Sequence, residues 1–165
     1  MLNLRDKVLY GILILVVGVL AVTLIYPNFL AETEVKVYFS GLQAQYLVPE
    51  TRKLRVNSLP QKLIKELIDG PTGEELGITI PQDTKLLDLK VNNQLATVNF
   101  SQELVKNHWG GTTGEMMTVY SIVNTLTQLD QIKRVQILVE GDKIETLAGH
   151  LDLNKPLKFD ESLIN

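Results

Sequence analysis

The stretch from Asn107 to Leu126, NHWGGTTGEMMTVYSIVNTL, comes closest in this chain to a nucleotide-binding loop. A glycine-rich turn that leads into an apolar helix can bind phosphate through the backbone N–H groups at the helix start. The stretch lacks the lysine that follows the last glycine of a phosphate-binding loop, and its spacing does not match a dinucleotide-binding fingerprint. Thr112 and Glu115 instead have the spacing of a capping box, and a carboxylate at Glu115 would repel phosphate. We therefore predict that Thr112 and Glu115 form a structural helix cap.

Other combinations of side chains that could perform catalysis or bind a metal ion are weak in this sequence. The chain has two histidines, His108 and His150, and no cysteine, so it offers few ligands for a zinc site of three or four residues. Neither histidine has a neighbouring nucleophile and acid that would indicate a catalytic triad. The segment Glu140–Asp142 resembles part of a calcium loop, but the remaining ligands are missing. The sequence therefore predicts no catalytic residue, no metal site and no cofactor.

The net charge and the length narrow the classes of partner and fold. The chain has 165 residues and a formal net charge of −3, so it lacks the basic field that gathers nucleic acid by counterion release. The length is typical of one domain, and a hydrophobic fraction of 45% is ordinary for a globular protein. We expect one globular domain that does not bind nucleic acid.

The N-terminal part of the chain is strongly apolar. No charged side chain occurs from residue 8 to residue 31, and Leu, Ile and Val dominate this run. A helix over Val8–Tyr26 would rise about 28 Å, close to the thickness of about 30 Å of a hydrocarbon core. Tyr10 and Tyr26 lie near its two ends, where interfacial aromatic residues belong, and Pro27 is expected to end the helix. We predict a transmembrane anchor over Val8–Tyr26.

Two alternatives to an anchor fit this segment less well. A cleaved signal peptide would have a shorter apolar region followed by two small residues at positions −3 and −1. Ala31 could stand at −1, but Phe29 would then stand at −3. A buried core helix is disfavoured because the run has no polar face.

The charges that flank the apolar run predict its orientation. Arg5 and Lys7 precede it, and Glu32 and Glu34 follow it. The positive-inside rule therefore places residues 1–7 in the cytoplasm and the rest of the chain outside. We expect a single-pass protein of the cell membrane, with a short linker over residues 27–34 that holds the extracytoplasmic domain close to the membrane.

Downstream of the linker, hydrophobic periodicity predicts hairpins that alternate with helices. A helix from Ser58 to Gly70 begins with a serine cap and Pro60, and Asn92-Asn93 suits a hairpin turn with positive φ. This order of hairpin, helix, hairpin, helix, hairpin indicates an α+β fold, with helices packed on one face of a mostly antiparallel sheet. The other expected elements are strands at 34–40, 46–56, 86–92, 95–100, 134–140 and 143–149, a short helical turn at 101–109 and a helix at 115–129.

Five segments of the chain, taken in order, resemble the GerMN domain family of sporulation and germination proteins. The resemblance covers Val35 to Leu157 and leaves residues 158–165 as a C-terminal tail. It implies a non-enzymatic extracytoplasmic α+β domain that acts in envelope or spore assembly, with a fold similar to the ring-building modules of secretion systems and of the sporulation channel. This chain has one such domain and a predicted membrane helix in place of a lipid-anchoring cysteine. The segments are VKVYFS with YLVPETRKL, LIKELIDGPT, GITIPQDTKLLDLKVNNQLATVNFS, GGTTGEMMTVYSIVNTLTQL and VQILVEGDKIETLAGHLDLNKPL.

These patterns favour two classes of function. A third class, an enzyme, is the least favoured. The first is an assembly module at the outer face of the membrane, whose partners are envelope or sporulation membrane proteins. Lys106, His108 and Trp109 are its expected partner-binding residues, because they lie in a long connection that carries the only tryptophan. The alternative is a module that binds cell-wall glycan or a small ligand. Exposed aromatic side chains lining a cleft would favour glycan binding, whereas a flat apolar patch or a free sheet edge would favour assembly.

Overall fold

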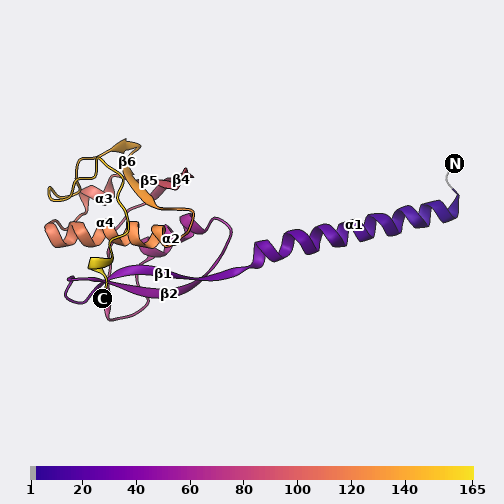
Figure 1. Ribbon diagram of the computed structural model, residues 1–165, viewed down its shortest axis with the longest axis horizontal. Helices are drawn as coiled ribbons and strands as arrows, with labels where there is room; N and C mark the ends of the chain where they lie inside the picture. The colour runs from indigo at the N-terminus through magenta and orange to yellow at the C-terminus, as the bar shows by residue number, and fades with distance from the viewer. Residues whose placement is uncertain (1–2) are drawn as a thin grey trace.

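The computed structural model describes residues 3–165, and for residues 23–30 it describes the backbone without the side chains. Helix α1, Leu4–Leu30, projects away from the domain (Figure 1). The predictions that Pro27 ends this helix and that residues 27–34 form a linker are wrong, because α1 continues to Leu30 and strand β1 begins at Glu32. The fixed φ of proline is a helical value, so the backbone at Pro27 can continue the helix, which loses the one hydrogen bond that a backbone N–H at this position would donate.

Within the part of the chain that the structure describes, no helix is both long enough and apolar enough to cross a membrane. Large apolar side chains between Val8 and Val22 are exposed along α1, and Tyr10 is 57% exposed. The structure does not describe the Tyr26 side chain, which was predicted to lie at the membrane interface. Residues 1 and 2 of the predicted cytoplasmic segment also lie outside the described residues.

Two sheets and two main helices form the domain. The first sheet has the order β2-β1-β3 and is antiparallel; the second has the order β4-β5-β6-β7 and contains one parallel pair, β5 with β6. The strands are β1 Glu32–Gly41, β2 Leu47–Arg55, β3 Leu76–Gly77, β4 Leu86–Asn92, β5 Leu95–Phe100, β6 Arg134–Val139 and β7 Asp142–Lys143. The helices are α2 Leu59–Asp69, α3 Glu103–Lys106 and α4 Thr112–Thr127, and a 3-10 turn covers Glu161–Leu163.

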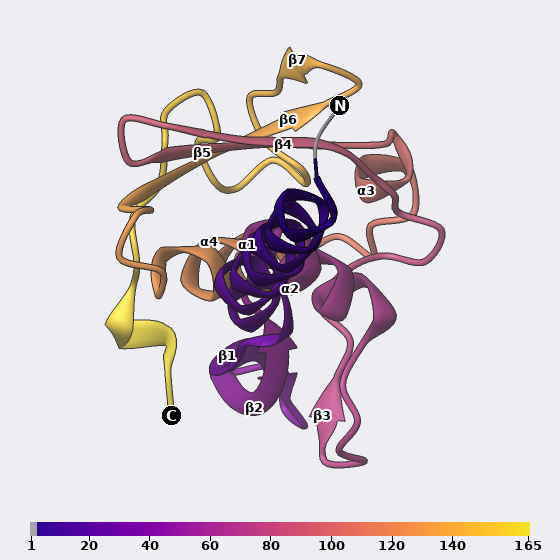
Figure 2. The same ribbon diagram turned by 90° about the vertical axis from the view of Figure 1, so that its right-hand side faces the viewer.

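Helices α2 and α4 lie between the two sheets (Figure 2). The α+β class is confirmed, but the helices form a middle layer rather than covering one face of a single sheet. The parallel pair arises because the chain passes from β5 through α3 and α4 before it returns as β6, and such a crossover brings the strands back in the same direction. Apolar residues from both sheets and both helices form one core: Val37, Phe39, Leu63, Ile64, Val98, Phe100, Ile122, Leu126, Val135 and Ile137.

The segment after β7 differs from the predicted strand at 143–149, because β7 ends at Lys143. The following chain instead packs across the domain, where Leu157 pairs with Val135 and Ile164 pairs with Leu47. The side chain of Asn124 in α4 bonds both backbone groups of Asp160, with distances of 2.9 and 3.0 Å. Residues 158–165 are therefore packed into the domain rather than forming a separate tail.

Candidate functional site

The loop between α3 and α4 shows how the glycine-rich stretch is used. Gly111, with φ of 78°, is the N-cap of α4, and no side chain caps the helix. The predicted capping box of Thr112 and Glu115 is therefore wrong. A side-chain cap requires the threonine to precede the helix, whereas Thr112 is its first residue. Glycine at the cap supplies the positive φ that a side chain would make costly.

Glu115 connects α4 to the loop that follows β7. Its side chain is fully buried. It accepts hydrogen bonds from the N–H of Leu147 and of His150, each at 2.8 Å, and from the hydroxyl of Thr146. Burial acts to raise the pKa of Glu115, but the hydrogen bonds from Thr146 and from the backbone together lower it below its ordinary value. This carboxylate therefore stabilises the fold as an anion.

His108 is held by hydrogen bonds at both ring nitrogens. Its Nδ1 accepts the N–H of Gly110 at 2.9 Å, and its Nε2 lies 3.2 Å from the hydroxyl of Thr118. That hydroxyl donates its proton to the carbonyl of Thr79 at 2.7 Å, so it must accept from His108. These contacts assign the neutral tautomer with the proton on Nε2. Burial lowers the pKa of His108 below its ordinary value, while the charge of Glu115 and a backbone bond to Gly114 act in the other direction.

The Trp109 ring packs against His108 and against the start of α4. Its ring stacks on His108 with centroids 5.2 Å apart and an interplanar angle of 22°. A Cβ atom at Gly114 would lie 2.6 Å from Trp109 Nε1, so the indole edge packs where only glycine fits. The side chain nevertheless remains 49% exposed. Trp109 is therefore an ordered aromatic residue presented to solvent.

A hollow of about 400 Å³ lies beside this indole and is lined by Ile78, Gln82, Asn107 and Trp109. Ile78 is 51% exposed, so the hollow has an apolar wall that faces solvent. We call these four residues together with His108 the Trp109 surface. The predicted site residues His108 and Trp109 are brought together here, whereas Lys106 does not line the hollow. Ile78 and Gln82 were missed because they lie some thirty residues earlier in the chain.

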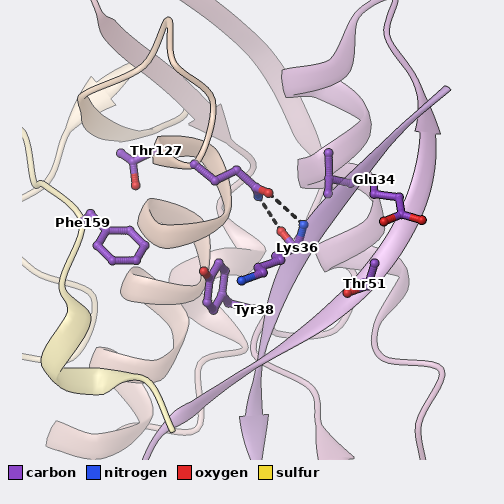
Figure 3. A pocket seen from close by; sticks show the side chains of 8 residues that line it. Glu34, Lys36, Tyr38, Thr51, Thr127 and Phe159 are labelled. Atoms are coloured by element: carbon purple, nitrogen blue, oxygen red, sulfur yellow. Dashed lines mark hydrogen bonds between the residues drawn. The ribbon is translucent and has the colours of Figure 1, made fainter. Parts of the chain in front are cut away.

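A second hollow, of about 550 Å³, lies along the edge of β1 and is lined in part by Lys36, Tyr38, Gln128 and Phe159 (Figure 3). The Gln128 side chain bonds both the N–H and the carbonyl of Lys36. Thr125 accepts the N–H of Tyr38 at 3.0 Å. Side chains at the end of α4 thus form hydrogen bonds with backbone groups of β1 that would otherwise be free to pair with another strand.

Among the residues that the structure describes, no three His, Asp or Glu side chains form a group that could hold a metal ion. His108, the histidine of the Trp109 surface, uses both ring nitrogens in hydrogen bonds within the protein.

Comparison with solved structures shows the fold. The tandem GerMN domains of the sporulation protein GerM from Bacillus subtilis match with a TM-score of 0.66 and 19% identity, over 78% of this chain and 46% of that one. The first GerMN domain of GerM alone matches with a TM-score of 0.64 and 18% identity, over 79% of this chain and 98% of that one. A putative lipoprotein from Clostridium perfringens matches with a TM-score of 0.57 and 30% identity, over 78% and 88%. The chain thus spans less than half of the tandem GerM structure.

Comparison of sequences shows the family. No curated protein matches the chain. A family model, Germane, described as sporulation and spore germination, matches residues 36–145, which is more than half of the chain. This match covers the Trp109 surface and both sheets except the start of β1, and it agrees with the GerMN resemblance of the sequence segments and with the structural matches to GerM. The chain therefore belongs to the Germane family of sporulation and spore germination domains.

Proposed function

We propose that this protein is a non-enzymatic, membrane-anchored extracytoplasmic module that binds other membrane proteins during sporulation or germination. The observation that carries the proposal is the Trp109 surface. Its indole is half exposed yet fixed by His108 and by Gly114. Tryptophan is enriched among the residues that contribute most to protein interfaces, and a fixed side chain loses little entropy on binding.

The proposed absence of catalysis is supported by the use of the polar groups near this surface. His108 is neutral and hydrogen-bonded through Gly110 and Thr118, so it has no ring nitrogen available as a general base. Glu115 is buried and accepts bonds from the loop at 146–150 rather than facing the hollow. The remaining lining side chains, from Ile78, Gln82 and Asn107, do not titrate.

The proposed attachment to a membrane is supported by α1. Its apolar side chains between Val8 and Val22 are exposed, and a continuous exposed apolar surface of this size marks a membrane or protein contact. Arg5 and Lys7 precede this part and Glu32 follows the helix, which favours a cytoplasmic N-terminus and an extracytoplasmic domain. The related Clostridium perfringens protein is described as a putative lipoprotein. Protease added to intact protoplasts should therefore digest the domain, whereas full protection or release of a soluble form would contradict the attachment.

The interaction proposal is tested by replacing Trp109 with alanine and crosslinking membranes that contain the full chain. Trp109→Ala should reduce recovery of the partner at least about tenfold, because hot-spot truncation commonly costs about 2 kcal/mol or more. Leu87→Ala is the matched control, because Leu87 is 47% exposed and does not line the hollow. Equal recovery of the same partner with Trp109→Ala would show that this surface is not the contact.

Binding of cell-wall glycan is the second candidate, and the amides beside the indole favour it. Gln82 and Asn107 line the same hollow as Trp109, and Asn107 donates to the carbonyl of Gln82 at 2.9 Å. An aromatic face flanked by amides suits a sugar ring, whose C–H face packs on the indole and whose hydroxyls bond the amides. Because the chain has one Trp, its fluorescence reports on this site directly. Saturable quenching by soluble wall glycan, without a protein partner, would favour this candidate.

A further inference from the structure

The chain enters the domain beside a cluster of cations. Glu32 at the start of β1 pairs with Arg55 at the end of β2, and the N–H of Val56 bonds the carbonyl of Ala31 at 2.9 Å. Lys53, Arg55, Lys62 and Lys65 line one hollow of about 450 Å³ at this end. We call these four residues the basic surface. We propose that it binds the anionic headgroups of phospholipids in the membrane that holds α1, and thereby fixes the orientation of the domain.

The charges on this surface are only partly compensated. Lys53 lies 3.7 Å from Glu34, but among the described residues no carboxylate forms an ion pair with Arg55 or Lys65. Two carboxylates, Glu32 and Glu66, line the same hollow. Glu66 is bound to Arg52, so the four cations face one carboxylate, Glu32, that forms no ion pair among the described residues. This excess of positive charge occurs in a chain whose formal net charge is −3, so it is a local feature rather than a property of the whole surface.

Lys62 adds a third cation without an acidic partner in the described chain. Its Nζ donates to the side-chain oxygen of Asn57 at 2.7 Å and to the carbonyl of Arg55 at 3.3 Å. Both acceptors are neutral, so they position the ammonium group and leave its charge uncancelled. The ammonium is therefore fixed beside the other cations of the basic surface.

The position of the surface favours a lipid over a soluble acidic partner. Only Ala31 separates the end of α1 at Leu30 from β1, and one residue spans at most about 3.6 Å. Whatever surface α1 enters must therefore lie next to the start of β1 and the end of β2. Val56 is 47% exposed in the adjoining turn, so it can enter the headgroup region beside the cations. Figure 1 shows that this end of the domain faces α1, and α3 lies at the opposite end.

The expected size of the effect follows from the number of cations. Each lysine or arginine near an anionic lipid surface favours the bound state roughly fivefold. Reversing both Lys62 and Lys65 should therefore lower the ratio of docked to undocked domain by at least about 25-fold. The attraction should weaken with added salt, because the surface potential falls off within a Debye length.

The inference rests on the proposed membrane attachment, and the experiment separates the two. The chain has no cysteine, so Val56→Cys gives a single site for a fluorescent label. The labelled full chain is reconstituted into vesicles of phosphatidylcholine, or of phosphatidylcholine and phosphatidylglycerol in equal parts. Quenching of the label by a headgroup spin-labelled lipid then reports how close Val56 lies to the membrane. We expect strong quenching in the anionic vesicles and weak quenching in the neutral ones.

The charge variants decide the outcome. Lys62→Glu with Lys65→Glu should abolish the difference between the two lipids, with the circular dichroism unchanged. The control, Lys143→Glu with Lys155→Glu, makes the same change in net charge at exposed positions outside the basic surface and should keep the difference. Equal quenching in both lipids, or the same loss in the control, would overturn the inference while leaving the attachment intact. Failure of the chain to float with either vesicle would overturn the attachment and, with it, the inference.

Discussion

Replacing Glu115 with glutamine should destabilise the domain by an amount that follows from its buried contacts. Glutamine keeps one oxygen that can accept from Thr146 and Leu147, but its amide nitrogen would face the N–H of His150. A hydrogen bond to a charged group contributes about 1.5–3 kcal/mol, and an unsatisfied buried donor costs about 1–3 kcal/mol. Because these effects overlap, we expect Glu115→Gln to lower the free energy of unfolding by about 2–4 kcal/mol at neutral pH.

The pH dependence of this difference follows from the pKa of Glu115, which is lowered in the folded state from an ordinary value of 4.5. A lowered pKa means that the unfolded chain binds the proton more readily, so the stabilisation is present above the unfolded value and is lost as the pH falls through the folded one. The difference between wild type and Glu115→Gln should therefore be full at pH 7 and shrink below the ordinary value of Glu. Urea denaturation of both proteins across this range measures it.

Glu145→Gln is the matched control, because Glu145 is exposed in the same segment and its side chain forms no hydrogen bond in the described structure. It should change the unfolding free energy by less than about 0.5 kcal/mol. Hydrogen exchange at the amides of Leu147 and His150 should accelerate in Glu115→Gln alone. If Glu115→Gln unfolds at the same urea concentration as wild type at pH 7, or if its deficit does not change in acid, the role assigned to this carboxylate is refuted.

Three further predictions concern Trp109 and the edge of β1. Gly114→Ala should displace the indole and shift the tryptophan fluorescence, because the added Cβ would lie 2.6 Å from Trp109 Nε1. Gly73→Ala, whose added Cβ would have its nearest neighbour at 3.8 Å, should leave the fluorescence unchanged. Acid should protonate His108 at Nδ1 and break the hydrogen bond that this nitrogen accepts from Gly110. Because the pKa of His108 in the folded state is lowered from 6.5, the stabilisation by neutral His108 is lost as the pH falls through that lower value. Tryptophan fluorescence should therefore show a transition below pH 6.5 that is absent in His108→Phe. Gln128→Ala should remove the exposed hydrogen bonds to the N–H and carbonyl of Lys36, lower the free energy of unfolding by about 0.5–1.5 kcal/mol in urea denaturation and increase self-association in sedimentation. The exposed Gln131→Ala should change neither quantity.

The short-range elements followed closely from local patterns. The helix expected after Ser58 begins at Leu59 with Pro60 in its first turn, and Gly70 ends it with φ of 89°, but the predicted serine cap is wrong because the Ser58 side chain makes no cap hydrogen bond. The hairpin at 86–100 is also present, although its turn residues with positive φ are Asn93 and Gln94 rather than Asn92 and Asn93. These features depend on backbone preferences of a few adjacent residues, so a single sequence carries enough information to predict them.

The layer arrangement and the site could not be predicted in the same way. Helix α4 is enclosed by both sheets, and its buried polar residues, such as Thr118 and Thr125, bond backbone groups of distant segments. A sequence shows such residues only as polar and does not show which distant backbone groups they bond. Glu115 had the spacing of a local cap, but its partners lie beyond residue 145. Likewise Ile78 meets Trp109 only through the tertiary fold.

The central claim, that the Trp109 surface is the contact surface of this domain, is tested most directly by site-specific photo-crosslinking in membranes. A photoreactive amino acid is placed at Ile78, which lines the hollow, or at Leu87, which is similarly exposed but lies outside it. We predict a discrete protein crosslink from Ile78 that is absent from Leu87 and is lost when Trp109→Ala is added. A crosslink of equal yield from both positions, or one from Ile78 that persists without the indole, would contradict the claim.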